Sequence, residues 1–179
     1  MKKITVVTGG AGFIGSHMVD LLLSKNYKVH VIDNLSGGHE RNISHNFNNK
    51  DFKFEKIDIC NLPSNHIFFS SCDYVFHFAG IGDIVPSIEN PISYINTNVI
   101  GTSRVLEASR KAKVKKFIYA ASSSCYGMAD TPTKETHSIN PLYPYALSKY
   151  LGEKLCFHWY QLYNLPIHHI ISYLSIDLV

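Results

Sequence analysis

Short apolar runs alternate with helical patterns along the whole chain. The runs are rich in β-branched and aromatic residues, and most of them are continuous rather than alternating with polar positions, which is typical of buried strands. The segment that ends at position 57 instead alternates with charged residues, as an outer strand would. The predicted strands cover residues 4–8, 28–33, 52–57, 74–78 and 116–120 and the apolar tail at 167–179.

Between these runs, apolar positions recur at helical spacing. The predicted helices cover residues 13–23, 92–112 and 145–163, whereas the polar, asparagine-rich stretch 34–50 is predicted as a loop or a broken helix. Strands and helices that alternate in this way, with continuous apolar strands, predict a parallel sheet covered on both faces. We therefore expect an α/β fold, one doubly wound parallel sheet, in a single domain over residues 1–179.

Composition narrows the class of protein further. The chain has 179 residues, of which 45% are hydrophobic, and this is enough for a core but too short for two large domains. A net charge of +3 with scattered basic residues gives no reason to expect nucleic acid or an anionic membrane as a partner. Charged residues make up 17%, below the roughly 25% usual for soluble domains, which suggests surface that something else covers.

Location follows from what the sequence lacks. No stretch approaches the roughly 20 apolar residues that span a bilayer, and the N-terminus does not resemble a signal peptide. The four cysteines are widely spaced without a Cys-x-x-Cys pair, so they are expected to be free thiols in a reducing compartment. We expect a cytoplasmic protein with no membrane segment.

A glycine cluster separates the first predicted strand from the first predicted helix. Glycines at 9, 12 and 15 permit a tight turn, let backbone approach a pyrophosphate, and let helix and strand pack closely. The helix N-terminus then offers free N–H groups to phosphates. The residues expected to contact a dinucleotide here are Gly9, Gly12, Phe13, Ile14 and Gly15.

Asp33 ends the second predicted strand, where a carboxylate can accept hydrogen bonds from a ribose diol. The same carboxylate would repel a 2′-phosphate, which favours NAD over NADP. The alternative is an ordinary strand-end turn with a solvated aspartate.

The spacing Gly-x-x-Gly-x-x-Gly resembles that of the extended short-chain dehydrogenase/reductases, the NAD-dependent epimerase/dehydratase family. Further segments resemble the same family in the same order, although each alone has an ordinary alternative as a cap or a solvated polar group. These are Asp33-Asn34-Leu35-Ser36 (ribose), Asp58-Ile59 (adenine), His77-Phe78-Ala79-Gly80 (nicotinamide half) and Asn98-Val99-Ile100-Gly101-Thr102, whose Asn braces the cofactor loop.

The resemblance implies a Rossmann fold with NAD as the cofactor. It adds several residues to the expected NAD-binding set. They are Asn34, Ser36, Gly37, Asp58, Ile59, Phe78, Ala79, Gly80, Asn98, Tyr145 and Lys149.

Tyr145 and Lys149 lie four residues apart, on one face of a predicted helix. A free tyrosine is a poor base at neutral pH, but a nearby lysine cation and a positive nicotinamide favour the phenolate. The lysine would also hydrogen-bond the nicotinamide ribose. Alone, such a pair is common on surface helices. The catalytic interpretation therefore depends on the serine-rich segment that precedes it.

The segment Ala121–Gly127 resembles the family's serine-rich strand end, which supplies a hydroxyl to the same substrate oxygen. Alignment on Tyr126-Gly127 favours Ser123 as the catalytic hydroxyl, with Ser122 and Ser124 as substrate-binding neighbours. The segment is one residue tighter than in some relatives, so the assignment holds to within one position. The alternative is a polar turn.

The reaction class follows from the same resemblance. The family's sugar dehydratases carry an Asp-Glu pair where this chain has Ser124 and Cys125. The remaining groups can move a hydride and a hydroxyl proton, which implies epimerisation through a 4-keto intermediate with NAD regenerated at each turnover. The serine and tyrosine segments are most similar to UDP-sugar 4-epimerases, of the UDP-glucose or UDP-N-acetylglucosamine type.

Two alternatives stay open: a catalytically silent NAD-binding fragment or cofactor-sensing module, and an NAD-dependent sugar 4-ketoreductase. The resemblance runs to about residue 170, and 168–179 departs from the family pattern, as if the substrate lobe were missing by truncation or a frame shift. We therefore expect a chain that binds NAD but turns over UDP-sugars poorly. His168-His169 lack a third ligand, so no metal is expected.

In family members, the helices that correspond to 92–112 and 145–163 pair across a two-fold axis. This implies a homodimer. The second helix carries Leu151, Leu155, Trp159 and Leu162 at helical spacing, although the domain's own core is an alternative use for them.

Overall fold

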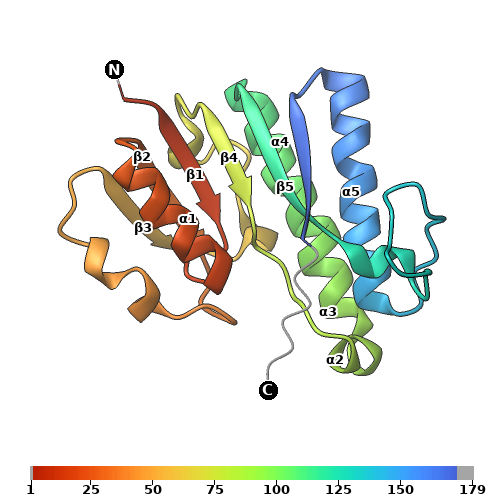
Figure 1. Cartoon of the computed structure of the whole chain (residues 1–179). Helices are drawn as coiled ribbons and strands as arrows, with labels where there is room; N and C mark the ends of the chain where they lie inside the picture. The colour runs from red at the N-terminus through yellow and green to blue at the C-terminus, as the bar shows by residue number, and fades with distance from the viewer. Residues whose placement is uncertain (1, 173–179) are drawn as a thin grey trace.

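The computed structural model describes residues 2–172, and within them one six-stranded sheet has the order β3-β2-β1-β4-β5-β6 (Figure 1). Each neighbouring pair is parallel, which confirms the predicted doubly wound sheet. The chain order reverses between β1 and β4, which opens a crevice at their carboxyl ends. The strands are β1 (Ile4–Thr8), β2 (Lys28–Asp33), β3 (Phe52–Lys56), β4 (Tyr74–His77), β5 (Lys116–Ser122) and β6 (Ile167–Ser172).

The helices agree with the predicted ones at α1 and α5, but the predicted helix at 92–112 is divided. Its first turns are a short helix, a π-helical segment follows at Asn96–Gly101, and a regular helix completes it. The stretch 34–50 contains two 3₁₀ turns, Glu40–Asn42 and Ser44–Asn46, as a broken helix would. The helices are α1 (Phe13–Ser24), α2 (Val85–Glu89), α3 (Pro91–Ile95), α4 (Thr102–Ala112) and α5 (Pro144–Tyr163).

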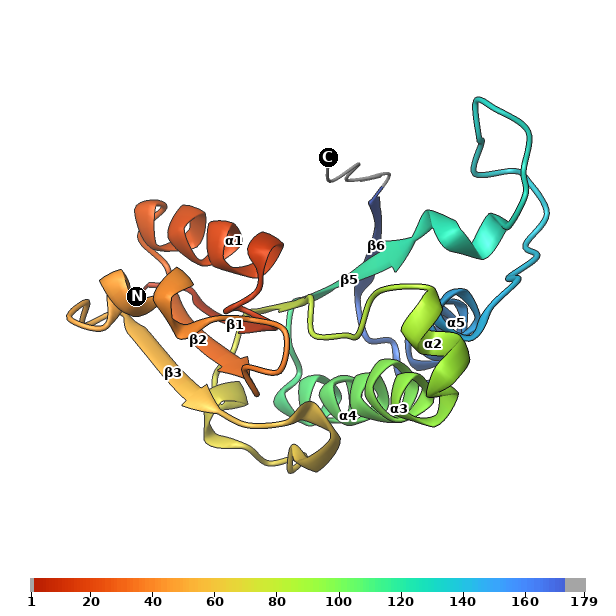
Figure 2. The same cartoon turned by 90° about the horizontal axis from the view of Figure 1, so that it is seen from below.

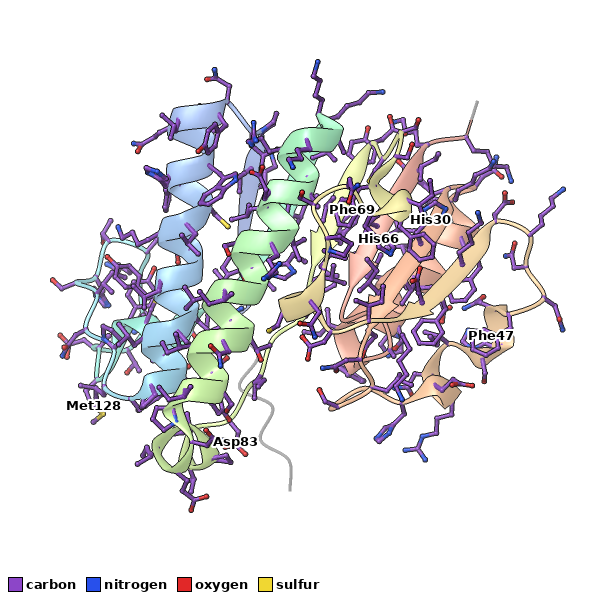
Figure 3. All side chains as sticks on the ribbon, turned by 180° about the vertical axis from the view of Figure 1, so that it is seen from behind. His30, Phe47, His66, Phe69, Asp83 and Met128 are labelled. Carbon is purple, nitrogen blue, oxygen red and sulfur yellow. The ribbon has the colours of Figure 1, made fainter. Side chains whose placement is uncertain are left out.

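The two faces of the sheet carry different helices. Figure 2 shows α1 on one face, beside β1 and β2, and α4 on the opposite face. Neighbouring residues of β1 point to opposite sides, so Val6 belongs to the core under α4 and α5 and Val7 to the core under α1. On the α4 side, Phe69 packs into the core near His30 and His66 (Figure 3). This cluster lies away from the carboxyl ends of the strands.

The first part of the C-terminal segment 167–179 is a regular strand of the sheet. β6 pairs with β5 from Phe117↔Ile167 to Ser122↔Ser172, so the strand-like character expected there is confirmed up to residue 172. Residues 173–179 lie outside the described part of the chain. No helix in the described range is long and apolar enough to cross a membrane.

Candidate active site

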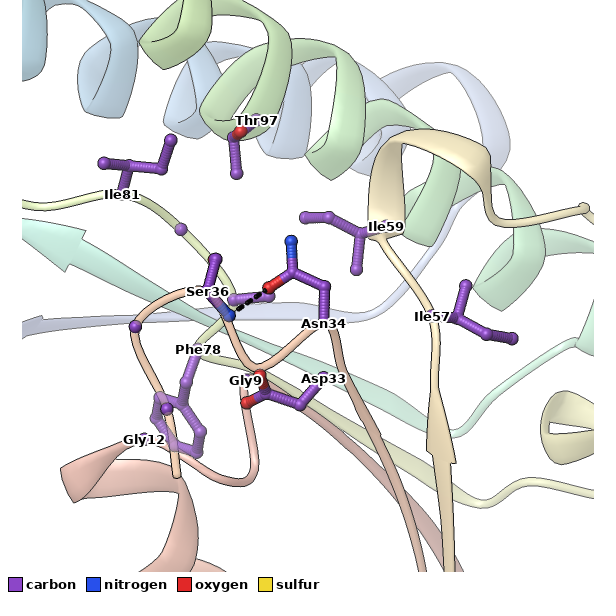
Figure 4. Close-up of a pocket in the computed structure, with 14 residues that line it drawn as sticks. Gly9, Gly12, Asp33, Asn34, Ser36, Ile57, Ile59, Phe78, Ile81 and Thr97 are labelled. Atoms are coloured by element: carbon purple, nitrogen blue, oxygen red, sulfur yellow. Dashed lines mark hydrogen bonds between the residues drawn. The ribbon is translucent and has the colours of Figure 1, made fainter. Parts of the chain in front are cut away.

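A crevice of about 210 Å³ lies at the switch point between β1 and β4 (Figure 4). Most of its walls come from the residues predicted to bind a dinucleotide, and sequence analysis missed Gly38, Ile57, Ile81 and Thr97. Its lining residues are Gly9, Gly12, Asp33, Asn34, Ser36, Gly37, Gly38, Ile57, Ile59, Phe78, Ala79, Gly80, Ile81 and Thr97.

The glycine loop leaves no room for side chains. Gly9 has φ +69°, and a Cβ there would lie 2.5 Å from the amide nitrogen of Ala79. A Cβ on Gly15 would meet the carbonyl oxygen of Gly9 and would lie 2.8 Å from the Cα of Gly10. The loop is therefore a bare-backbone cradle, which is what close approach of a pyrophosphate requires.

The first turn of α1 completes this cradle. Phe13 and Ile14 occupy its first two positions, where N–H groups have no acceptor inside the helix. Their side chains are 65% and 41% exposed and do not line the crevice, so a contribution from these residues would come through the backbone.

Asp33 is held at the floor of the crevice. Its Oδ2 accepts from the amide of Ala11 at 2.9 Å and its Oδ1 from the amide of Leu35 at 2.8 Å, with 7% of the residue exposed. A carboxylate has about four acceptor sites, so both oxygens can still accept from a ribose diol. Asp33, which is predicted to bind a ribose, thus lines the crevice with acceptor sites still free.

Asn34 links the second and third strand ends. Its Oδ1 accepts from the amide of Ser36 at 3.0 Å (Figure 4), and its Nδ2 donates to Asp58 Oδ2 at 3.0 Å. Asp58 also accepts from the amide of Cys60 at 2.8 Å, and this bond, more than the one from Asn34, lowers the pKa of Asp58. Asp58 itself does not line the crevice, whereas its neighbour Ile59 does.

Asn98 holds the backbone of Ile81, in the loop after β4 that lines the crevice. Its Oδ1 accepts from the amide of Ile81 at 2.8 Å and its Nδ2 donates to the carbonyl of Ile81 at 2.9 Å. Asn98 is 2% exposed and lies in the π-helical segment. Gly80 must approach it closely, because a Cβ there would lie 3.0 Å from Asn98 Oδ1.

A second group of polar side chains gathers where β5 ends against the start of α5. The hydroxyl of Tyr145 lies 3.4 Å from that of Ser122. Lys149 donates from Nζ to the carbonyl of Ala120 at 2.6 Å, and its ammonium lies 4.5 Å from the ring centre of Tyr119. Burial lowers the pKa of Lys149 to about 8, so the side chain is a cation at neutral pH.

The serine whose hydroxyl lies beside that of Tyr145 is Ser122, one position before the predicted Ser123 and within the range that the prediction allowed. β5 extends as far as Ser122, whose hydroxyl also accepts from the amide of Ser124 at 3.2 Å. Ser123 begins the 3₁₀ turn Ser123–Tyr126, so the backbone has already left the strand there. The position of the strand end, which a motif alignment does not contain, therefore favours Ser122 as the hydroxyl in the proposal below.

With Ser122 as the hydroxyl, the two residues that follow it are Ser123 and Ser124 instead of Ser124 and Cys125, and neither pair contains a carboxylate. Cys125 itself is 2% exposed, and burial raises the pKa of its thiol. A buried neutral thiol is a poor general acid or base at neutral pH. Within residues 2–172, the site thus combines a phenol, a hydroxyl and a cation, and Ser123, Ser124 and Cys125 add no carboxylate to them.

Comparison with known proteins agrees with this geometry. The model of the NAD dependent epimerase/dehydratase family matches residues 5–173. The putative UDP-glucose 4-epimerase of Methanocaldococcus jannaschii is 39% identical over 175 residues, which cover 96% of this chain and 55% of that protein. This chain therefore spans about half the length of the curated relatives it matches.

Solved structures show the same relation. A UDP-N-acetylglucosamine 4-epimerase from Methanobrevibacter ruminantium is 35% identical with a TM-score of 0.88, over 94% of this chain and 54% of that one. A UDP-glucuronic acid 4-epimerase from Bacillus cereus, in complex with UDP-glucuronic acid and NAD, is 34% identical with a TM-score of 0.87. That match covers 94% of this chain and 55% of the other.

Proposed function

This chain belongs to the NAD-dependent epimerase/dehydratase family, and on that premise we propose that it provides the NAD-binding and acid–base half of a nucleotide-sugar 4-epimerase. The observation that carries the proposal is the Tyr145–Ser122 pair at the same edge of the sheet as the glycine cradle. Ligands of α/β sheets bind at this edge, beside the switch point.

NAD, when bound, accepts a hydride and returns it. The cradle of Gly9, Gly12 and Gly15 and the free amides of α1 would hold its pyrophosphate, and Asp33 would hold the adenosine ribose. Ile57 and Ile59 offer apolar surface for an adenine ring at the far wall. Phe78, Ala79 and Gly80 line the opposite wall, toward Asn98.

The side chains at the end of β5 would carry the proton. Tyr145 Oη would take it from the C4 hydroxyl of a sugar and later give it back, and Ser122 would hydrogen-bond the same oxygen. Lys149 stays charged at neutral pH and lies one helical turn from Tyr145, where it would hydrogen-bond the nicotinamide ribose. Ser124 is proposed as a further contact to the substrate.

Epimerisation is favoured over dehydration because eliminating water needs an acid and a base in addition to the phenol, and none of Ser123, Ser124 and Cys125 is suited to those roles. The relatives reported above are described as 4-epimerases of UDP-sugars, and this supports a UDP-sugar as the substrate. A sugar 4-ketoreductase would use the same three side chains, so the products of turnover distinguish it.

We also propose a homodimer through α4 and α5, which lie side by side on one face (Figure 3). Phe157, Tyr160 and Leu162 leave apolar surface on α5, at 43%, 56% and 58% exposed. By contrast, Leu155 and Trp159 pack against the domain's own core. For these two residues, burial in the core, the alternative to a dimer contact, therefore holds.

The test has a binding part and a turnover part. Calorimetry measures NAD affinity of the chain, and turnover of UDP-galactose and UDP-N-acetylgalactosamine is followed with added NAD. Turnover is measured for the chain alone and for a fusion to the second half of the M. jannaschii relative. We expect NAD binding by both and turnover by the fusion.

Ser122→Ala and Ser123→Ala form the matched pair for the acid–base assignment. In the fusion, we expect Ser122→Ala to lower kcat by about 100-fold and Ser123→Ala to leave it within about threefold. A fusion that binds NAD without turning over either sugar would overturn the epimerase proposal. Equal effects of the two substitutions would overturn the role given to Ser122.

A further inference from the structure

Beneath the crevice, buried polar side chains cross the switch point from β1 to β4 and on to α4. Thr8 and His77 end their strands as register partners, and the Thr8 hydroxyl lies 2.6 Å from His77 Nδ1. The other ring nitrogen, Nε2, lies 2.9 Å from the hydroxyl of Thr102. Thr8, His77 and Thr102 are at most 1% exposed, so water cannot readily replace a lost partner.

The direction of each hydrogen bond can be assigned from the acceptors. The Thr102 hydroxyl donates to the carbonyl of Asn98 at 2.7 Å, so its oxygen accepts from His77 Nε2–H. Burial, and to a smaller degree the Lys149 cation, lowers the pKa of His77 to about 3. The ring is therefore neutral, and its unprotonated Nδ1 accepts from the Thr8 hydroxyl.

The chain of bonds continues from Asn98 to the catalytic turn of α5. Asn98 Nδ2 donates to Ser148 Oγ at 2.9 Å, and the Ser148 hydroxyl donates to the carbonyl of Tyr145 at 2.7 Å. Ser148 is fully buried. Two series of hydrogen bonds thus meet at Asn98, one on its main-chain carbonyl and one on its side-chain amide. Joined through this residue, they lead from Thr8, next to Gly9 in the phosphate cradle, to the backbone of Tyr145.

We propose that His77 is a positioning residue that couples the glycine loop to the turn carrying Tyr145, so that a diphosphate in the loop orders the tyrosine's turn. This inference rests on the proposed function, because it needs the NAD site at the loop and Tyr145 as the acid–base group. His77 itself lines no part of the crevice. Hydrogen bonds from Thr8 to the Asn98 carbonyl polarise one another. Loss of one of them lets Asn98 move, and its side-chain bond to Ser148 moves with it.

Thr102 is the position at which the chain of bonds can be interrupted. Thr102→Val replaces the hydroxyl with a methyl group of similar size, whereas Thr102→Ser keeps the hydroxyl. Ser109→Ala is the matched control, because Ser109 is also fully buried on α4 and donates to the carbonyl of Val105 at 2.7 Å. Ser109 lies outside the chain of bonds that contains His77.

Each variant is titrated with ADP, which carries a diphosphate but no nicotinamide ribose and so does not extend toward Tyr145. Amide NMR follows Gly12 as a reporter of loop occupancy and Ser148 as a reporter of the catalytic turn. We expect ADP to shift both resonances in the wild-type chain, Thr102→Ser and Ser109→Ala. In Thr102→Val we expect the Gly12 resonance still to shift, with an ADP affinity about fivefold weaker than in the wild type. The Ser148 resonance should not shift in this variant.

Side-chain ¹⁵N spectra of the wild-type chain should show His77 protonated on Nε2. A Ser148 response in Thr102→Val equal to that of the wild type, or a His77 proton on Nδ1, would overturn the inference. If Thr102→Val does not fold, Thr8→Val breaks the same series at its other end and is judged by the same two resonances. If neither ADP nor NAD shifts Gly12 in the wild-type chain, the proposed function fails, and the inference fails with it.

Discussion

Gly15→Ala is the substitution to which the candidate cofactor site should be most sensitive. The new methyl group would meet the carbonyl oxygen of Gly9 and lie 2.8 Å from both the carbonyl carbon of Gly9 and the Cα of Gly10. These are backbone atoms, so no side chain can rotate away. Either α1 must move away from the loop or the loop must open.

The cost can be worked from this contact. Overpacking typically costs about 1–3 kcal/mol, and a rigid backbone neighbour places Gly15→Ala at the upper end. Alanine is favoured over glycine inside a helix by about 0.5–1 kcal/mol, so the net loss of stability is about 2 kcal/mol. With a urea dependence of about 1–3 kcal/mol per molar, the unfolding midpoint should fall by about 1 M.

Urea unfolding followed by circular dichroism measures the stability, and calorimetry measures NAD affinity, which we expect to fall at least tenfold. Gly82→Ala is the control: a Cβ there meets no described atom within 4 Å, and the residue does not line the crevice. Its stability should change by less than about 0.5 kcal/mol. A Gly15→Ala variant as stable as Gly82→Ala, with unchanged NAD affinity, would refute the reasoning.

Three further predictions follow from the site and the helix face. The chain should bind NAD at least about fivefold more tightly than NADP, and Asp33→Asn should remove that preference; calorimetry showing tighter NADP binding would contradict it. Burial lowers the pKa of Lys149 from 10.5 to about 8 in the folded chain. Between these two pH values the unfolded chain binds this proton and the folded chain has lost it, so the free energy of unfolding rises with pH. Lys149→Met should lack this contribution when urea unfolding is compared at pH 7.5 and 9.5. Light scattering at micromolar concentration should find a dimer, and Leu162→Glu on α5 should convert it to monomer without unfolding it.

The sheet and the phosphate cradle were predictable because both rest on local patterns. Continuous apolar runs mark strands that are covered on two faces, and the spacing of Gly9, Gly12 and Gly15 encodes the close approach that the structure shows. Asp33 was predictable for the same reason, since it directly ends a strand whose neighbour carries the glycines.

The interruption at Asn96–Gly101 was not predictable from hydropathy. The apolar spacing of residues 92–112 predicts one continuous helix. The π-helical segment is associated instead with tertiary contacts of Asn98 with Ile81 and Ser148, which hydropathy does not contain. Gly38, Ile57 and Thr97 were missed as crevice residues because nothing local distinguishes them from other loop residues. They line it because three separate segments meet at the switch point.

Lys149 shows most clearly what a motif leaves open. A tyrosine and a lysine four residues apart predict a cation one turn from the phenol, but they say nothing of how stable that cation is. The fold buries Lys149 between the Ala120 carbonyl and the Tyr119 ring, and these two contacts replace only part of its hydration. The lowered pKa, about 8, is the result, so the positive charge of Lys149 is lost at moderately alkaline pH. The pH at which Lys149 loses its charge thus depends on how deeply α5 packs against the end of β5, which the Tyr-x-x-x-Lys spacing does not encode.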